Sequence, residues 1–144
     1  LLTISVTEDE VLGIGGENLE GFYSIMKYFQ SQDNPNNKVF VKAFKEMWGD
    51  DSVIGDVTQA AYLGPWLWKA AVERAGSFDV DKVVAESEKG DIELTTAPEG
   101  YVKLHKNHHL WSKARVGRWN KDGQATVVYT SELLEPDPFP AGYQ

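Results

Sequence analysis

The sequence predicts an α/β fold, and two patterns support this prediction. Residues 56–76 repeat apolar side chains at helical spacing. A strand-like segment, a short helix and an extended segment precede them, and the chain after Gly90 alternates with the period of β-strands. This order contains too few strand–helix alternations for a complete doubly wound sheet. We therefore expect part of an α/β protein, with an end rich in β-hairpins.

Composition predicts a globular chain that does not bind nucleic acid. Of the 144 residues, 42% are hydrophobic and 25% are charged, which is typical of one soluble domain. The formal net charge is −8, whereas phosphate binding needs clustered positive charge. There is no cysteine, which excludes disulfides and thiolate chemistry. The chain opens in a strand-like segment without Met or a signal peptide, and we expect a segment of a longer protein.

The start of the chain predicts a strand, a capped helix and a second extended segment. Leu1–Val6 alternates and is rich in residues that favour strands. Thr7 and Glu10 have the spacing of a capping box, which begins a helix that ends near Gly13. Glu20–Phe29 is aromatic-rich and is expected to be extended.

A turn at residues 32–35 leads into the second predicted helix. Asn34 can cap this helix, Pro35 suits its first position, and Gly49 ends it. Its expected apolar face consists of Val39, Phe40, Ala43, Phe44, Met47 and Trp48.

The long apolar stretch predicts a third helix, from Asp56 to Gly76. Asp56 can cap its first N–H groups, and Gly76 can adopt the left-handed conformation at its end. Pro65 lacks the N–H that would bind the Ala61 carbonyl, so we expect a kink within one helix. The expected buried stripe consists of Val57, Ala60, Ala61, Gly64, Leu67, Ala71, Val72 and Ala75.

One more helix and several strands complete the pattern. Asp79 can cap a helix over Val80–Lys89, which Gly90 ends. The helix residues expected to be buried are Val80, Val83 and Val84. The expected strands are 92–95, 101–104, 114–119 and 124–130, and a hairpin turn at residues 120–123 joins the last two. Three prolines within residues 135–140 exclude a central strand there, so we expect an extended tail.

No stretch predicts a catalytic site, a metal site or a cofactor, and we expect a protein that is not an enzyme. Residues 8–10 are three acids in the first turn of a helix, where negative charge favours the helix dipole. His105, His108 and His109 could bind zinc only in a suitable geometry, and their spacing matches no zinc motif. The nucleophile motif G-x-S-x-G does not occur.

Five segments together resemble the C-terminal third of a type I periplasmic solute-binding protein. They are Ser5–Gly49, Gln59–Val83, Ala97–Trp119, Asp122–Tyr129 and Glu135–Pro140. The most specific pieces are GIGGEN, then APEG followed by HLW, then PDPFP. The class is the one that includes branched-chain amino acid binders. Within it the chain looks most similar to the ABC transporter proteins that bind urea or short-chain amides.

The resemblance implies two three-layer αβα lobes joined by three crossovers, with the ligand in the cleft between them. Residues 1–20 would then end the second lobe, and residues 21–30 would form a crossover. Residues 31–128 would complete the first lobe, and residues 129–144 would form the return crossover and tail. The missing N-terminal part of the same protein would carry most of the cleft.

The resemblance also implies capture of a small neutral solute, urea or a short-chain amide, and its delivery to an ABC permease of the inner membrane. We expect a periplasmic location, or an extracellular and membrane-tethered one. Two alternatives remain open: binding of a branched-chain or other amino acid on the same fold, and an amide-sensing regulatory protein. Without its N-terminal part the chain would have unpaired sheet edges and exposed apolar faces, so we expect it to self-associate.

Three ligand-binding residues follow from the resemblance: Ser5, Thr7 and Tyr62. Ser5 stands near the place where amino acid-binding relatives have an acid that meets the ligand's ammonium group. A neutral hydroxyl both donates and accepts hydrogen bonds, which suits urea or an amide. The register leaves Thr3 and Thr7 as alternatives to Ser5. Tyr62, near the start of the long helix, either contacts the ligand or packs in the core.

Overall fold

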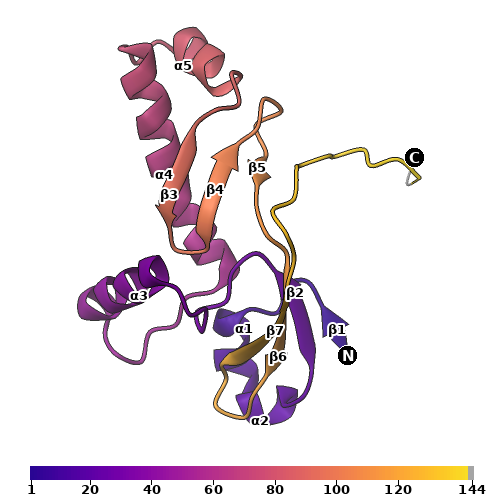
Figure 1. The fold of residues 1–144 in the computed structure, drawn as a ribbon. Coiled ribbons are helices and arrows are strands. Elements are labelled where there is room, and N and C mark those ends of the chain that lie inside the picture. The colour runs from indigo at the N-terminus through magenta and orange to yellow at the C-terminus, as the bar shows by residue number, and fades with distance from the viewer. Residues whose placement is uncertain (143–144) are drawn as a thin grey trace.

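The computed structural model describes residues 1–142, which form two β-sheets with helices packed around them (Figure 1). The elements in chain order are β1 (Leu2–Thr3), α1 (Glu8–Ile14), α2 (Gly16–Leu19), β2 (Tyr23–Met26), α3 (Pro35–Trp48), α4 (Asp56–Ala75), α5 (Val80–Ser87), β3 (Glu93–Ala97), β4 (Gly100–Leu104), β5 (Leu110–Trp111), β6 (Arg115–Trp119) and β7 (Ala125–Thr130). The predicted α/β fold is confirmed.

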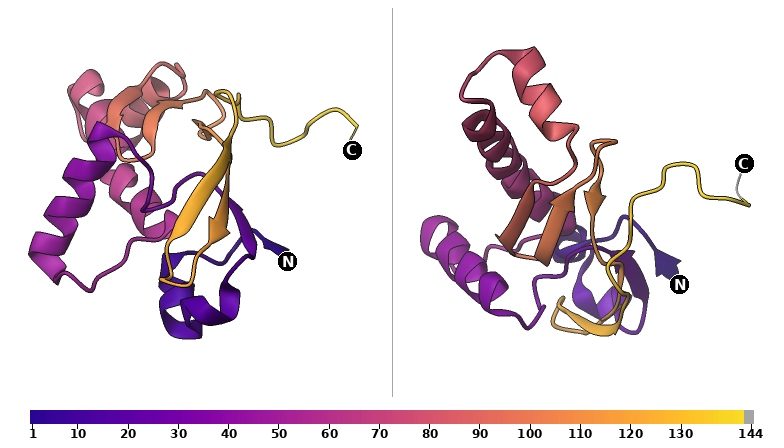
Figure 2. Two further views of the ribbon diagram at one scale, coloured as in Figure 1. Left: turned by 60° about the horizontal axis from the view of Figure 1, so that its bottom comes forward. Right: turned by 45° about the horizontal axis from the view of Figure 1, so that its top comes forward.

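One sheet joins the start of the chain to its end. Its strand order is β1-β2-β6-β7, with β1 parallel to β2 and the other neighbours antiparallel. The second sheet, β3-β4-β5, is antiparallel and packs against α4 (Figures 1 and 2). We refer to β1, α1, α2, β2, β6 and β7 as the basal unit. The apical unit comprises α3, α4, α5, β3, β4 and β5.

The chain passes between the two units through short connecting segments. Residues 27–34 lead from β2 to α3, and residues 112–114 lead from β5 to β6. Ser112 forms an isolated antiparallel bridge with Leu134, so the tail runs back along the second connection. The two connections hold the units side by side.

The hairpin of β6 and β7 belongs to the basal unit, since β6 pairs with β2. Within this chain the hairpin therefore groups with the N-terminal segment rather than with the helices before it. The lobe boundaries of the complete protein stay a prediction. Residues 143–144 of the predicted tail lie outside the described residues.

The basal core forms where α1 and α2 pack on the first sheet. Its buried members are Val11, Leu19, Met26, Phe29, Trp119 and Ala125. The rings of Phe29 and Trp119 meet edge to face, with centroids 6.0 Å apart. The Trp119 indole N–H donates to Ser24 Oγ (2.9 Å), and the Ser24 hydroxyl donates to the Val6 carbonyl (2.8 Å). This buried serine ties the segment after β1 to the centre of the sheet.

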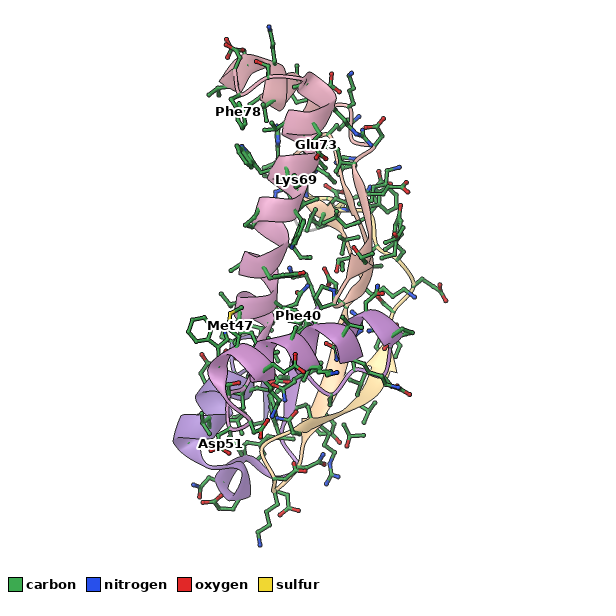
Figure 3. All side chains as sticks on the ribbon, turned by 90° about the vertical axis from the view of Figure 1, so that its left-hand side faces the viewer. Phe40, Met47, Asp51, Lys69, Glu73 and Phe78 are labelled. Atoms are coloured by element: carbon green, nitrogen blue, oxygen red, sulfur yellow. The ribbon has the colours of Figure 1, made fainter. Side chains whose placement is uncertain are left out.

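The apical core lies between α4 and the second sheet. Its buried residues are Leu63, Ala97 and Val102 at one end and Ala71, Ile92 and Leu104 at the other. Lys69 and Glu73 of α4 remain exposed and form an i,i+4 ion pair (2.5 Å; Figure 3). The helix therefore presents one apolar face to the sheet and a charged face to solvent.

The long helix is confirmed, but its predicted cap is wrong. α4 begins at Asp56 itself, and Gly55 occupies the N-cap position without a side-chain hydrogen bond. The Asp56 carboxylate instead accepts the Tyr28 N–H (2.8 Å), a partner 28 residues away. Gly76 ends the helix in the left-handed conformation (φ 58°), as predicted. Pro65 lies within one continuous helix.

The buried face of α4 is rotated from the predicted stripe. Three residues of that stripe are exposed: Val57, Ala61 and Gly64. The buried residues of the helix are Gln59, Leu63 and Ala71, with Leu67 and Ala70 packed beside them. The predicted stripe was mostly alanine and glycine. These side chains remove little apolar area from water, so they fix the rotation of a helix only weakly.

The helices α3 and α5 begin at their predicted caps, whereas α2 was not predicted and begins after Gly15 without a side-chain cap. Asn34 Oδ1 accepts the Asn37 N–H (2.9 Å) at the start of α3. Asp79 Oδ1 accepts the Lys82 N–H (3.1 Å) at the start of α5.

The predicted burial of α5 is wrong at two of three positions. Val80 and Val84 are exposed, whereas Val83 packs against the apical core. Because this short helix packs chiefly on α4, one row of its side chains suffices for the contact.

The β-rich end is confirmed, and the first strand is shorter than predicted. The hairpin of β6 and β7 closes where Asn120 N–H donates to the Gln124 carbonyl (2.9 Å). β1 covers two residues of the predicted Leu1–Val6, because only these pair with a neighbouring strand, at Tyr23–Ser24. β5 was not predicted, since two residues are too few to show a period.

Gly117→Ala is expected to lower the free energy of unfolding by roughly 1–3 kcal/mol. A Cβ at this position in β6 would lie 2.5 Å from the Phe29 ring, within the basal core. Gly13→Ala in α1 is the matched control, because its Cβ would meet nothing within 4 Å. The control should be neutral or stabilise by about 0.5–1 kcal/mol. Urea unfolding followed by tryptophan fluorescence measures both, and equal midpoints would contradict the close packing.

Candidate ligand-binding site

The two units are joined by side chains that accept hydrogen bonds from main-chain N–H groups. Four such bonds gather where α1, the first connection and the start of α4 meet. They run from Gln30 N to Glu8 Oε1 (2.8 Å), from Gly55 N to Asp9 Oδ2 (3.0 Å), from Ile54 N to Gln30 Oε1 (2.7 Å) and from Tyr28 N to Asp56 Oδ1 (2.8 Å). We name these four bonds the junction. They determine how α4 sits on the basal unit, because buried N–H groups have to be paired.

Glu8 is the most buried acid of the junction. Glu8 has 1% of its surface exposed, and its Oε2 atom has no hydrogen-bond partner within residues 1–142. Burial raises the pKa of Glu8 from 4.5 to about 7, and the neighbouring Asp9 and Asp56 add to the effect. The hydrogen bond from Gln30 N–H opposes this rise of the pKa. Glu8 therefore exchanges its proton near neutral pH.

Thr7 lies beside the junction, and its hydroxyl has structural partners. Thr7 Oγ1 donates to Glu10 Oε2 (2.6 Å) and accepts the Asp9 N–H (3.3 Å). The Thr7 main-chain N–H also donates to Glu10 Oε2 (2.7 Å), which confirms the predicted capping box. A Cβ built on Gly55 would lie 2.3 Å from Thr7 Oγ1. The hydroxyl thus packs directly against the residue that precedes α4.

Ser5 and Thr3 lie on the segment that leads to the junction. Ser5 is exposed and follows the end of β1. Thr3 Oγ1 forms a hydrogen bond with Ser24 Oγ (3.0 Å), so its hydroxyl is held within the basal sheet. Of the three hydroxyl candidates, Ser5 is the one whose side chain faces solvent.

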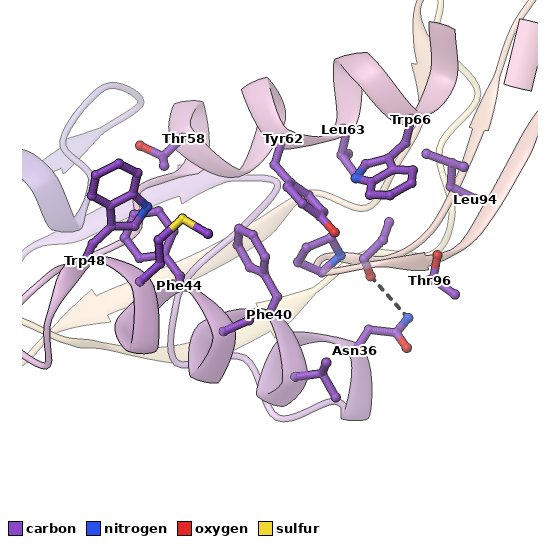
Figure 4. A pocket seen from close by; sticks show the side chains of 15 residues that line it. Asn36, Phe40, Phe44, Trp48, Thr58, Tyr62, Leu63, Trp66, Leu94 and Thr96 are labelled. Carbon is purple, nitrogen blue, oxygen red and sulfur yellow. Dashed lines mark hydrogen bonds between the residues drawn. The ribbon is translucent and has the colours of Figure 1, made fainter. Parts of the chain in front are cut away.

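Tyr62 lies in an apolar groove between α3 and α4 (Figure 4). The groove has a volume of about 710 Å³, and we name it the aromatic groove. Its lining includes Val39, Phe40, Phe44, Tyr62, Leu63 and Trp66. The Tyr62 ring lies against Phe40 (centroids 4.6 Å apart, 40° between planes) and near Trp66 (6.0 Å). Tyr62 remains 41% exposed, so its ring covers the groove wall without being enclosed.

A second hollow, more polar and of about 740 Å³, is lined by residues of both connections and of the β6–β7 hairpin. Arg115 lines it and donates to the carbonyls of Lys27 and Glu99. Glu99 Oε2 accepts from the Ser112 hydroxyl (2.8 Å). Burial raises the pKa of Glu99 and lowers that of Arg115. These bonds fasten the second connection to the first, so the hollow borders the joint between the units.

The structure brings the predicted site residues together only in part. Thr7 contacts Gly55, and Tyr62 follows Gly55 by seven residues, or about 10 Å along α4. Ser5 precedes Thr7 by two residues but makes no contact with the aromatic groove. Ser5 and Thr7 therefore lie beside the junction, whereas Tyr62 lies in the aromatic groove of the apical unit, so the three candidates do not converge on one point.

No metal centre is formed by the described residues. Within residues 1–142 no group of three or more His, Cys, Asp or Glu side chains is placed to hold an ion. His105 Nε2 lies 3.3 Å from Glu135 Oε1, and His108 Nε2 lies 3.7 Å from Glu88 Oε1. In the same residues, no helix combines the length and apolar character needed to cross a membrane.

Sequence reasoning missed the residues of the junction. Glu8 and Asp9 were assigned to the helix dipole, and Asp56 was assigned to a cap. Their partners lie 22, 46 and 28 residues away, and no spacing rule connects such positions. One signal was present: three adjacent acids exceed what one helix start requires.

The chain belongs to the periplasmic binding protein domain family, whose model matches residues 1–144. It has the fold of a type I periplasmic binding protein, as the resemblance implied. A limonene hydroxylase from Geobacillus stearothermophilus is 34% identical over 128 residues. Those residues are 89% of this chain and 22% of that protein.

Solved structures share the fold over most of this chain. A solute-binding protein of an ABC transporter from Rhodopseudomonas palustris HaA2, in complex with p-hydroxybenzoic acid, has a TM-score of 0.78 and 25% identity. The match covers 94% of this chain and 38% of that one. A leucine-binding protein from Thermotoga maritima has a TM-score of 0.68 and 26% identity, over 85% of this chain and 34% of that one. The chain thus spans about a third of the length of these structures.

Glu8→Gln is expected to change how stability depends on pH. The pKa of Glu8 is about 7 when folded, so the folded protein holds a proton that the unfolded chain releases from about pH 4.5 upward. Stability therefore falls as pH rises from about 4.5 to 7, by about 3 kcal/mol in total, and levels off above. Glutamine keeps an acceptor for Gln30 N–H and cannot ionise, so the part of the slope that Glu8 contributes should disappear, and a smaller slope from the buried Glu99 should remain.

Glu10→Gln is the control for this pH experiment. Hydrogen bonds from Thr7 lower the pKa of Glu10, so its contribution is lost below about pH 4.5 rather than above it. Urea unfolding at several pH values gives both slopes. An unchanged slope between pH 4.5 and 7 in Glu8→Gln would contradict the burial of an ionisable Glu8.

Gly55→Ala should break the junction. The new Cβ would lie 2.3 Å from Asp9 Oδ2 and from Thr7 Oγ1, so α1 and the start of α4 have to separate. We expect the free energy of unfolding to fall by roughly 1–3 kcal/mol. Gly64→Ala, in the same helix with nothing within 4 Å of its Cβ, should be neutral or slightly stabilising. Thermal unfolding that shows no difference between the two variants would contradict this role of Gly55.

Proposed function

We propose that this chain is part of the substrate-binding component of an ABC transporter, which captures a small neutral solute and delivers it to a permease of the inner membrane. One observation supports this most: the family model spans the whole chain, and the matching structures are described as solute-binding proteins of ABC transporters. Such a protein meets its solute outside the cytoplasmic membrane. We therefore place it in the periplasm, or tethered on the outer side of the membrane.

The solute that we favour is urea or a short-chain amide. Ser5 offers an exposed, uncharged hydroxyl just before the junction. Asp9, the exposed acid nearest to it along the chain, already accepts from Gly55 N–H and the Thr58 hydroxyl (3.3 Å). The ammonium group of an amino acid requires a carboxylate partner, whereas an amide or urea needs only neutral donors and acceptors.

Binding would act through the joint between the units. Periplasmic binding proteins close around their ligands by hinge motion. In this chain the first connection and the junction form such a joint, with Ser5 and Thr7 on one side and Tyr62 on the other. A solute that contacts both sides stabilises the closed arrangement by its differential affinity for it.

Two alternatives remain: another class of solute and another kind of protein. The leucine-binding protein from Thermotoga maritima is 26% identical, which favours an amino acid on the same fold. An amide-sensing regulatory protein would use the same contacts without a permease. One relative is named a limonene hydroxylase, which is an enzyme. This chain corresponds to only 22% of that protein, so the name does not assign catalysis to this chain.

Calorimetric titration of the full-length protein separates these possibilities. We expect saturable binding of urea or acetamide, weaker binding of leucine, and no turnover of the bound amide. Tight binding of leucine with none of urea or acetamide would replace the first proposal by the amino acid alternative. Hydrolysis of the amide would overturn the proposal of a binding protein.

Tyr62→Ala is expected to weaken binding of the solute about tenfold, if the ring forms part of the cleft wall. Tyr62→Phe keeps the contact with Phe40 and should bind nearly as well unless the hydroxyl meets the solute. Tyr129→Ala, an exposed tyrosine of β7, is the control and should leave the affinity unchanged. Equal affinities for Tyr62→Ala and Tyr129→Ala would assign Tyr62 to packing alone.

A further inference from the structure

Three acids of the junction each accept a main-chain N–H group at the boundary between the units. The bonds join Glu8 to Gln30, Asp9 to Gly55 and Asp56 to Tyr28. Asp9 is exposed and Asp56 is half-buried, so water reaches their charges, whereas Glu8 is enclosed. Gln30 extends the contact of Glu8, because its own Oε1 accepts the Ile54 N–H (2.7 Å) just before α4. Glu8 thus holds α1 to the start of α4 through Gln30.

The surroundings of Glu8 oppose a negative charge on it. Within residues 1–142 Glu8 forms no ion pair, and the charges that act on it are those of Asp9 and Asp56, both negative. Burial raises the pKa of Tyr28 and Glu8 adds to the rise, so this phenol stays neutral. Arg115 of β6 interacts with Asp56 and is not among the charges that act on Glu8. An ionised Glu8 would therefore be a third, uncompensated negative charge in the junction.

The other buried acid of the joint has positive charges beside it. Glu99 is 3% exposed, and its Oε2 accepts from the Ser112 hydroxyl of the second connection (2.8 Å). Lys27 and Arg115 oppose the rise of its pKa that burial causes. Ionisation of Glu99 therefore adds an attraction at the second connection. The two sides of the joint respond in opposite ways to the loss of a proton.

Each unit has an apolar core of its own. One cluster of buried apolar residues lies on the basal side and two lie in the apical unit, and none of the three includes members from both units. Figure 1 shows the two units one above the other, joined by the connecting segments. Loss of the junction bonds can therefore open the joint beside α1 without unfolding either core, while the second connection still holds the units together.

We propose that Glu8 is a proton-dependent latch between the units: protonated, it holds the start of α4 against α1, and ionised, it lets the two separate while both units stay folded. The pKa of Glu8 is about 7 in the paired junction, against an ordinary value of 4.5 once water reaches the carboxyl group. Opening therefore releases a proton between these two pH values. The junction is tightest below about pH 4.5, loosens as pH rises to about 7 and loosens no further above it.

Hydrogen–deuterium exchange of the full-length protein tests this latch without any solute, so its outcome is separate from that of the titration with urea or acetamide. Peptides over residues 27–34 and 52–56 contain the N–H groups of the junction, and peptides over residues 115–130 contain the paired strands β6 and β7. Exchange is measured by mass spectrometry at about pH 5 and about pH 8, each with and without guanidinium chloride below the unfolding transition.

We expect the protection of the junction N–H groups, corrected for their intrinsic exchange rates, to fall about tenfold or more from about pH 5 to about pH 8. It should depend little on guanidinium chloride, because local opening exposes little surface, whereas the protection of β6 and β7 should fall steeply with it. Equal dependence of both sets on guanidinium chloride would overturn the proposal, because the junction would then open only by unfolding.

Variants identify the group that titrates. Glu8→Gln keeps an acceptor for the Gln30 N–H and should remove the pH dependence of exchange at the junction, whereas the matched control Glu99→Gln should retain it. Asp9→Asn removes the stronger of the two negative charges near Glu8, so the loss of protection should move to lower pH. This variant tests the latch independently of how well Glu8→Gln folds. A pH dependence that is unchanged in both Glu8→Gln and Asp9→Asn, or absent from the parent protein, contradicts the latch.

Discussion

The arrangement of this chain depends on pairing buried main-chain N–H groups where two units meet. A helix or sheet pairs its own main-chain N–H groups. Tyr28, Ile54 and Gly55 lie in connecting segments, which have no such regular pairing. An unpaired buried N–H costs about 1–3 kcal/mol, so three of them would remove a large share of a small domain's stability. Side chains of α1, the first connection and α4 supply the missing acceptors. The junction therefore selects one position of α4 on the basal unit.

The position of α4 on the basal unit in turn determines which of its side chains face the apical sheet and which face α3. Asp56 is drawn toward Tyr28 N–H and Gly55 toward Asp9, which fixes the rotation of the first turn. Leu63 then faces the apical sheet and Tyr62 faces α3, so the aromatic groove is a consequence of bonds formed more than a turn away. An apolar stripe of alanines could not have fixed this rotation of α4, because several rotations of the helix bury similar areas of alanine.

The sequence predicts the local features of this fold and misses the distant ones. The capping box at Thr7, the cap at Asn34, the end at Gly76 and the hairpin turn at residues 120–123 follow from neighbours within four residues, and each was found where expected. The burial of Glu8 and the role of Asp56 depend on partners more than 20 residues away. The candidate site had the same limit. Its residues were placed by resemblance, because none of them belongs to a motif that a local pattern could identify.

The joint is polar and incompletely paired, which bears on how such a protein could move. Glu8 Oε2 and both amide atoms of Gln59 are buried without a hydrogen-bond partner in the described residues, so the joint holds polar atoms that are open to further pairing. A solute shifts the balance between two arrangements of the joint only by its differential affinity for them. The aromatic groove lies wholly in the apical unit. The polar joint lies outside this groove, so a hinge motion of the proposed kind would take place at the joint and leave the groove unchanged.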